Sequence, residues 1–349
     1  MIPAAVSATI LLFLMRGISW SDLGTSISRI PPAALAIYAL ASGAGLLLRA
    51  IRFRLLLPQP RPGAAPILLV TMVQNCLGDL VPGRLAALGS YVYLLVRRLG
   101  VGLEPAAATF LLSFVFELAT LGPVLALAAL VRIDAVAGAL PLKFPLGWIV
   151  AVGVGFFLAA GVALHGLAPI TRTLAGFVRG PSAGPAPVAA SRRQELAVRL
   201  VSLAGAMDEV REAGTLVPVF LVSMVIRLAK YVSLYALMTG LLAGAGAAGR
   251  LPDFWDLILG ITATELIAGL PIPALGQFGV WEGGMTGALV LLGLDRGPAT
   301  IVSIGIHGIA QAYEYLLGIV ALGILAVTSG KTSGKPAAGI TPAARAKRQ

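Results

Sequence analysis

Hydrophobic residues in this chain gather into long runs that Pro or Gly residues begin or interrupt. The six runs lie at 2–15, 31–51, 105–131, 145–170, 215–245 and 298–327. Five of them reach the roughly 20 residues that a helix needs to cross a bilayer. The first is shorter, and because no Lys or Arg precedes it and no clear cleavage site ends it, we interpret it as an anchor helix. The pattern predicts about six full membrane spans.

Two further apolar stretches, 63–98 and 255–294, are broken near their middle. The first contains GDLVPGR, and the second contains ELIAGLPIPALGQFGVWEGG, with two prolines and five glycines. Non-helical backbone at membrane depth is tolerated only where protein or a water-filled cavity surrounds it. We therefore expect two broken re-entrant hairpins that line a cavity. Two short spans at each stretch, or a tight outer loop at 265–284, are the alternatives, since Gly and Pro are ordinary turn formers.

Composition places the chain among membrane proteins. It is 58% hydrophobic and 12% charged, whereas soluble domains are about 25% charged. The single cysteine, Cys76, excludes an internal disulfide, and two histidines without cysteine partners make a metal site improbable. There is no nucleotide-binding motif, so we expect no cofactor. The net charge of +11 would suit nucleic acid, but the basic residues are not interleaved with aromatic ones, and we predict no nucleic-acid partner.

Basic residues cluster between the apolar runs and predict the topology. The four groups are Arg49, Arg52, Arg54 and Arg61; Arg97 and Arg98; Arg172, Arg179, Arg192, Arg193 and Arg199; and Lys331, Lys335, Arg345, Lys347 and Arg348. The positive-inside rule places all four groups in the cytoplasm. The loops 16–30, 132–144 and 246–254 are then outside. We expect a multi-pass protein of the bacterial inner membrane with both termini in the cytoplasm.

This topology predicts an inverted repeat. The hairpin 63–98 begins and ends inside, while 255–294 begins and ends outside, so the two enter from opposite faces. An echo supports the repeat: LGVGLEPA at 99–106 corresponds to LGLDRGPA at 292–299. The predicted divisions are an N-terminal half at 1–178, a linker with an amphipathic inner-surface helix at 179–213, a C-terminal half at 214–329 and a disordered basic tail at 330–349. The fold class is an all-α polytopic membrane protein.

Ionisable residues lie within the predicted spans. Arg227 is 12 residues into its helix and hence about 18 Å deep, with Lys230 one turn further. Three helical faces each carry polar residues at i, i+4 and i+7: Ser223, Arg227 and Lys230; Ser113, Glu117 and Thr120; His307, Gln311 and Glu314. The hairpins add Asn75, Asp79, Arg84, Glu265, Gln277 and Glu282. Such groups are costly in a membrane and face a partner or a watery path.

A structural explanation of these charges stays open. Arg227 could pair with Glu117 or Glu314 merely to hold the helices together. For His307 a structural hydrogen bond is the favoured interpretation. Tyr313 and Tyr315 are expected to pack in the ordinary way.

Four segments carry a resemblance to a known family: RAIRFRLLL, QNCLGDLVPGRLAALGSYVYLLVRRLG, FVFELA and GLPIPALGQFGVWEGG. They resemble the membrane region of bacterial lysylphosphatidylglycerol synthase/flippases and their stand-alone relatives, including hopanoid-associated membrane proteins. The resemblance covers about 30–327. The chain departs from the family where a Glu is common and Ala86, Ala87 and Leu88 stand here. It also lacks the soluble aminoacyltransferase domain, so we expect no lysine transfer by this chain alone.

The resemblance implies lipid translocation between leaflets, passive or ion-coupled. Moving a phospholipid head group requires a polar path with cations for phosphate and acids for an amine. We expect Arg227 and Lys230 to contact phosphate, Arg84 to act at the inner entry, and Glu117, Glu282 and Glu314 to bind an amino group or protons. The remaining predicted substrate contacts are Asn75, Asp79, Gln277 and His307. A lipid-modifying membrane enzyme and an accessory subunit of a lipid-biosynthesis complex stay open as alternative functions. The expected partners are membrane lipids, and a homo-oligomer or a lipid-biosynthesis protein stays open as a further partner.

Overall fold

The computed structural model describes residues 2–80, 85–132, 146–179, 188–246, 252–268 and 274–329. These residues form helices joined by short connections, and none of them lies in a β-strand. Within the described residues five helices are long and apolar enough to cross a membrane. They belong to α3 (Pro32–Leu56), α6 (Leu103–Val131), α8 (Leu146–Arg179), α10 (Leu216–Gly244) and α13 (Arg296–Ser329). They correspond to the five long apolar runs, and the predicted all-α polytopic membrane fold is confirmed.

The N-terminal region holds two shorter helices. Helix α1 (Ile2–Leu14) has 13 residues and therefore spans only about 20 Å, less than the hydrocarbon core. Helix α2 (Trp20–Ser28) lies in a segment that the sequence assigned to a loop. It begins with a capping box at Ser19 and packs against α10, where the Ser26 hydroxyl donates a 2.8 Å bond to the carbonyl of Leu241.

Each of the two broken stretches forms a pair of short helices. The first pair is α4 (Ala64–Leu80) and α5 (Leu85–Leu99), and the second is α11 (Phe254–Ala268) and α12 (Val280–Leu291). The longest, α4, has 17 residues and reaches about 26 Å, short of the roughly 30 Å core. The breaks at 81–84 and 269–273 lie outside the described residues.

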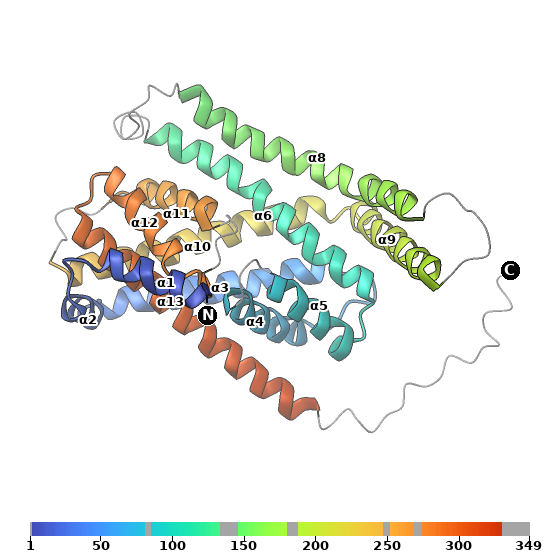
Figure 1. Ribbon diagram of the computed structural model, residues 1–349, viewed down its shortest axis with the longest axis horizontal. Helices are drawn as coiled ribbons and strands as arrows, with labels where there is room; N and C mark the ends of the chain where they lie inside the picture. The colour runs from blue at the N-terminus through green and yellow to red at the C-terminus, as the bar shows by residue number, and fades with distance from the viewer. Residues whose placement is uncertain are drawn as a thin grey trace.

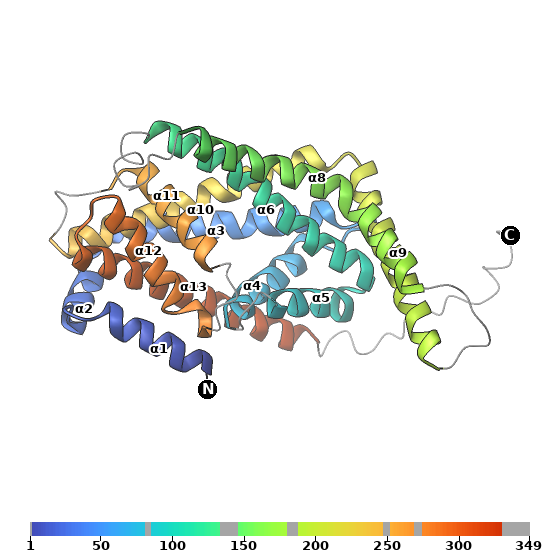
Figure 2. The same cartoon turned by 45° about the horizontal axis from the view of Figure 1, so that its top comes forward.

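The two hairpins occupy opposite ends of the molecule. Helices α3 and α10 run antiparallel along each other, since Ala34 lies against Gly240 and Gly45 lies against Ala229. The hairpin α4–α5 follows α3, and the hairpin α11–α12 follows α10, so they enter from opposite ends (Figures 1 and 2). This is the predicted arrangement. Whether each hairpin is re-entrant or two short spans stays a prediction.

The packing repeats between the two halves of the chain. Helix α4 packs against α13, the last long helix of the other half, and α11 packs in turn against α6. This exchange of partners is what two halves related by a two-fold axis produce. This packing supports the inverted repeat that the sequence predicts.

The similar segments 99–106 and 292–299 also have similar structures. Gly100 and Gly293 both follow the second arm of a hairpin with positive φ, 67° and 94°. Pro105 and Pro298 are each the third residue of the next long helix. Glycine reaches this left-handed backbone without the Cβ clash, and Pro near a helix start removes an N–H that has no partner there. A glycine with positive φ therefore ends each hairpin, and a proline in the first turn begins α6 or α13.

Helix α9 (Val188–Glu212) contains the segment predicted as an amphipathic helix. It packs against α8 and α6, burying Ala204, Met207 and Val210, while Arg192 and Arg193 remain exposed. The contact of its outer face with lipid stays a prediction. The linker residues 180–187 and the tail 330–349 lie outside the described residues.

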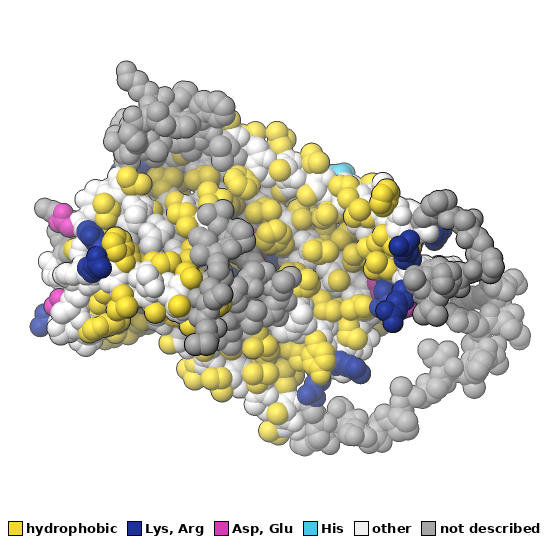
Figure 3. All heavy atoms as spheres, in the orientation of Figure 1, with side chains coloured by type: hydrophobic (Ala, Val, Ile, Leu, Met, Phe, Trp, Pro, Cys, Tyr) yellow, Lys and Arg dark blue, Asp and Glu magenta, His cyan; other side chains and the backbone are white. Residues whose placement is uncertain are grey.

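The surface has the distribution expected of an integral membrane protein. Hydrophobic side chains cover the middle of the face in Figure 3, and charged side chains gather toward its two ends. On α8, Leu158 is 60% exposed and Val162 is 71% exposed. Such exposure is unfavourable in water and favourable in hydrocarbon. The protein is therefore a multi-pass membrane protein, whereas its membrane and the side of its termini stay predictions.

Candidate functional site

Arg227, near the middle of α10, is the centre of a buried polar cluster. Its Nε donates to the hydroxyl of Thr120 at 3.0 Å, and its Nη2 donates to the backbone carbonyl of Glu117 at 2.6 Å. Its Nη1 lies 3.3 Å from the hydroxyl of Tyr231 and 3.4 Å from Oε2 of Glu265. Arg227 is only 9% exposed. Three helices, α6, α10 and α11, therefore hold this one guanidinium.

Glu265 is the carboxylate shared by the two predicted cations. Its Oε2 pairs with Arg227, and its Oε1 forms an ion pair with the ammonium of Lys230. Glu265 lies in the last turn of α11, just before the break at 269–273. The sequence singled out Glu265 only as a polar residue of the hairpin, and its structural alternative named Glu117 or Glu314 as a partner for Arg227. The partner of the observed ion pair is instead Glu265, because the α11 arm packs beside α10.

Arg52 extends the cluster to α3. Its Nη2 donates a 2.9 Å bond to Oε1 of Glu117. Arg52 is 1% exposed, and its buried Nε and Nη1 have no hydrogen-bond partner within the part of the chain that the structure describes. The sequence placed Arg52 in a basic group between two apolar runs, on the cytoplasmic side. Its place between the runs is wrong, because α3 continues through Leu56 and turns the buried Arg52 side chain toward α6. The cytoplasmic side stays a prediction.

We name five connected residues the interior cluster: Arg52, Glu117, Arg227, Lys230 and Glu265. Hydrogen bonds and ion pairs connect them in series across α3, α6, α10 and α11. Counted at their formal charges, three cations and two carboxylates leave one positive charge. Arg52 and Arg227 are buried, while the side chains of Glu117 and Lys230 are 37% exposed. An excess positive charge among apolar helices attracts an anion more strongly than it does in water.

A second buried cluster joins α12 to α13. The Oε2 of Glu282 accepts a 2.6 Å bond from the N–H of Gly279, which caps α12, and its Oε1 lies 2.7 Å from Nδ1 of His307. The Nε2 of His307 lies 3.2 Å from Nε2 of Gln311. Both oxygens of Glu282, which is 0% exposed, are thus engaged by the protein. The structural hydrogen bond expected for His307 is present, while a substrate role for either residue stays a prediction.

The backbone just before α12 is unusual. Gly276 has φ 57° and Gln277 has φ 59°, and Gln277 is the only non-glycine with positive φ among the described residues. Left-handed backbone is rare for side chains larger than glycine. Helix α1 covers this segment, since the hydroxyl of Ser7 accepts a 2.9 Å bond from the N–H of Leu275. A Cβ on Gly279 would lie 2.9 Å from that of Ile10, so only glycine fits there.

The other predicted site residues lie apart from the interior cluster or outside the described part. Asn75 is half-buried on α4. Glu314 on α13 interacts electrostatically with Tyr38. The side chain of Asp79, and all of Arg84, lie outside the described residues. The expected ordinary packing holds for Tyr313, whose ring meets that of Tyr38 at 5.5 Å.

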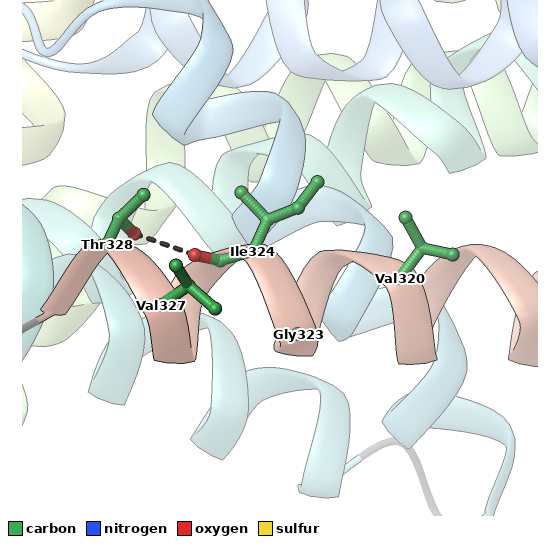
Figure 4. A pocket seen from close by; sticks show the side chains of 5 residues that line it. All are labelled: Val320, Gly323, Ile324, Val327 and Thr328. Atoms are coloured by element: carbon green, nitrogen blue, oxygen red, sulfur yellow. Dashed lines mark hydrogen bonds between the residues drawn. The ribbon is translucent and has the colours of Figure 1, made fainter.

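Two further features bear on where a ligand could bind. Among the described residues no group of three or more His, Cys, Asp or Glu side chains is arranged to hold a metal ion. A hollow of about 410 Å³ lies on α13, lined by Val320, Gly323, Ile324, Val327 and Thr328. Its one hydroxyl, that of Thr328, donates to the carbonyl of Ile324 in the same helix (Figure 4). This uncharged lining suits hydrocarbon and supplies no polar group for a head group.

Comparison with known protein families identifies the family of this chain. Residues 1–318 match the family described as the lysylphosphatidylglycerol synthase TM region. A search of curated proteins finds no match. Since the family match covers most of the chain, the protein belongs to this family, as the sequence motifs indicated. The family relates it to membrane lipids.

Proposed function

We propose that this member of the lysylphosphatidylglycerol synthase TM-region family is a flippase-like transporter. It moves a phospholipid, anionic or aminoacylated, between leaflets without ATP hydrolysis. The observation that carries the proposal is the interior cluster, which has one more cation than carboxylates and holds Arg52 and Arg227 buried between apolar helices. A phosphate group balances that excess charge.

The cost of the cluster supports a functional role. Burying an ion pair gains little compared with apolar packing, and leaving guanidinium N–H groups without partners costs about 1–3 kcal/mol each. Arg52 has two such nitrogens. A phosphate oxygen or a water molecule that accompanies the lipid supplies the missing acceptors. We assign Arg227, Lys230 and Arg52 to the phosphate, and Glu117 and Glu265 to an amino group or to protons.

The position of the cluster suits alternating access. Arg52 and Glu117 come from the first half of the chain, whereas Arg227, Lys230 and Glu265 come from the second. A rocking motion of one half against the other changes the distances between these groups. Because Glu265 stands at the end of an arm of the second hairpin, a shift of that arm opens its ion pairs. The predicted inner entry at Arg84 remains part of this proposal.

The enzyme and accessory-subunit alternatives have less support. The Glu282–His307 pair has acid–base chemistry, but Glu282 is fully buried and both of its oxygens bind the protein. An accessory subunit does not require excess charge in its interior. Both alternatives predict that the interior cluster is dispensable for lipid movement.

Lipid exchange in liposomes tests the proposal. Purified protein is reconstituted with fluorescent phosphatidylglycerol, lysyl-phosphatidylglycerol or a neutral lipid, and outer-leaflet quenching is followed over time. We expect protein-dependent exposure of an anionic or aminoacylated lipid that Arg227→Ala abolishes. If every lipid stays in place with and without ion gradients while the protein is folded, the proposal is wrong.

A matched variant separates transport from folding. Arg132 at the end of α6 also pairs with an acid on α11, since its Nε lies 2.7 Å from Oδ1 of Asp256. Arg132→Ala thus breaks a bond between helices without touching the interior cluster. We expect it to lower thermal stability while exchange continues. Equal loss of exchange in both variants would make Arg227 a structural residue only.

A further inference from the structure

A groove of about 430 Å³ lies between the end of α3 and the start of α4. Its walls are formed by residues at i, i+3, i+4 and i+7 along each side. They are Leu47, Ala50, Ile51, Arg54 and Leu55 on α3, and Arg61, Ala64, Ala65 and Leu68 on the connection and α4. Leu47 is 53% exposed and Ile51 is 46% exposed. The groove is thus apolar along most of its length, with both of its charged residues near the α3–α4 connection.

Backbone hydrogen bonds fix the two arginines in place. The Nε of Arg54 donates to the carbonyl of Pro62 at 3.1 Å. Arg61 donates to the carbonyl of Leu57 at 3.1 Å and to that of Leu55 at 3.3 Å, at the end of α3. These bonds hold both guanidinium groups without neutralising them.

Both guanidinium groups keep unused donors. Among the described residues no carboxylate pairs with Arg54 or Arg61. Both Nη groups of Arg54 and the Nη1 of Arg61 have no protein acceptor there. Two fixed positive charges beside an apolar groove match an amphiphile with a negative head.

We propose that this groove binds one anionic phospholipid. The phosphate accepts hydrogen bonds from Arg54 and Arg61, and an acyl chain lies along Leu47, Ile51 and Leu68. From residue 47 to residue 54, α3 advances about 10 Å, which gives the chain an apolar wall of that length. A volume of 430 Å³ is within the range of ligand pockets.

The groove is separate from the interior cluster. Arg52 lies on the inward side of α3, bonded to Glu117, whereas Arg54 and Ile51 face the groove. Lipid bound here therefore need not be the lipid that is transported. Binding at the groove is measured without transport, and its failure leaves the proposed flippase activity untouched.

Native mass spectrometry of the detergent-solubilised protein measures this binding. The probes are dioctanoyl phosphatidylglycerol, dioctanoyl phosphatidylcholine and inorganic phosphate. We expect one phosphatidylglycerol to bind with an affinity at least tenfold above that of phosphatidylcholine. Both lipids offer a phosphate to the two arginines, but the trimethylammonium of phosphatidylcholine is repelled by them and cancels the negative charge of the head group. Phosphate that displaces phosphatidylglycerol at equal concentration would show a simple anion site and overturn the proposal.

Two variants test the two ends of the site. Arg54→Gln removes one phosphate donor and raises the Kd for phosphatidylglycerol about tenfold. Ala65→Phe fills the apolar part without changing charge and also abolishes binding. The matched controls are Arg97→Gln, at an exposed arginine of α5, and Ala36→Phe, on an exposed part of α3 away from the groove.

The controls decide between a specific site and general attraction. If Arg97→Gln weakens binding as much as Arg54→Gln, the lipid follows surface charge alone and the proposal is wrong. It is also wrong if Ala65→Phe leaves the affinity unchanged. Thermal unfolding of each variant establishes that it is folded, and Arg54→Gln alone suffices for the test where Ala65→Phe is unstable.

Discussion

Arg227 donates its shortest hydrogen bond, 2.6 Å, to the backbone carbonyl of Glu117, whose own side chain accepts a 2.9 Å bond from Arg52. One residue of α6 therefore receives a cation from α10 on its backbone and another from α3 on its side chain. Because both arginines bind Glu117, displacement of either arginine moves the hydrogen-bond acceptor of the other. This connection makes the interior cluster a single unit between the two halves of the chain.

Glu265→Gln is expected to destabilise the protein. It leaves Arg227 and Lys230 without their shared carboxylate, and removing one member of a buried ion pair costs about 3 kcal/mol or more. Thermal unfolding in detergent measures the change. The control, Glu212→Gln, alters an exposed residue of α9 and should stay within about 0.5 kcal/mol of the native protein. Equal stability of both variants would contradict the shared ion pair.

Arg52→Met separates stability from function when combined with Glu117→Gln. The single change leaves Glu117 without Arg52 and should cost about 1–2 kcal/mol, because water partly screens the Glu117 carboxylate, which is 37% exposed. The double change removes both charges and should recover most of that loss. We expect lipid exchange to stay low in the double variant, because a phosphate contact is missing. If the double variant recovers both stability and lipid exchange, the Arg52–Glu117 pair has a structural role only.

Glu282 and His307 should be energetically coupled. Their 2.7 Å bond predicts that Glu282→Gln and His307→Phe are less costly together than the sum of the two separate changes. A double-mutant cycle should give a coupling of about 1 kcal/mol or more. Thr328→Val, near the far end of α13, supplies the control and should add independently to Glu282→Gln. Strict additivity in both cycles would show that the Glu282–His307 hydrogen bond contributes no coupling free energy.

Gly318→Ala should disturb the packing of α13 on α4. A Cβ at this position would lie 2.3 Å from the Cβ of Cys76, closer than any real contact. Such overpacking costs about 1–3 kcal/mol. Gly323→Ala on the same helix meets nothing within 4 Å and should be neutral or stabilising.

A second substitution identifies the cause of that loss. Cys76→Gly removes the obstructing Cβ, so it should recover part of the stability that Gly318→Ala loses. Thermal unfolding of the single and double variants gives the comparison. No recovery would place the strain elsewhere in the α4–α13 contact.

Much of the fold was predictable because the bilayer constrains the sequence directly. Hydrocarbon thickness sets the length of a span, which is why five apolar runs became five long helices. Helix α8 nevertheless continues nine residues beyond the predicted run, to Arg179, and α2 was missed because it is only nine residues long. Short or charged helices depend on packing and capping more than on hydrophobicity.

Part of the candidate site was predictable from depth alone. Arg227, Lys230 and Glu117 stood out because an ionisable residue in the middle of an apolar run is costly wherever its partner lies. Arg52 did not stand out, since it sits among other arginines at the end of a run. Glu265 was noted without a partner, because a broken hairpin can be placed beside several helices.

The sequence by itself determined the all-α membrane class, the long spans, the two broken hairpins and the glycine and proline punctuation shared by the two halves. Each of these follows from local chemistry: hydrophobicity, helix length and backbone freedom. Only the tertiary structure decided that Glu265 pairs with Arg227 and that Arg52 turns inward to Glu117. Helical periodicity tells which residues share a face, but which helix covers that face depends on packing between segments distant in the chain.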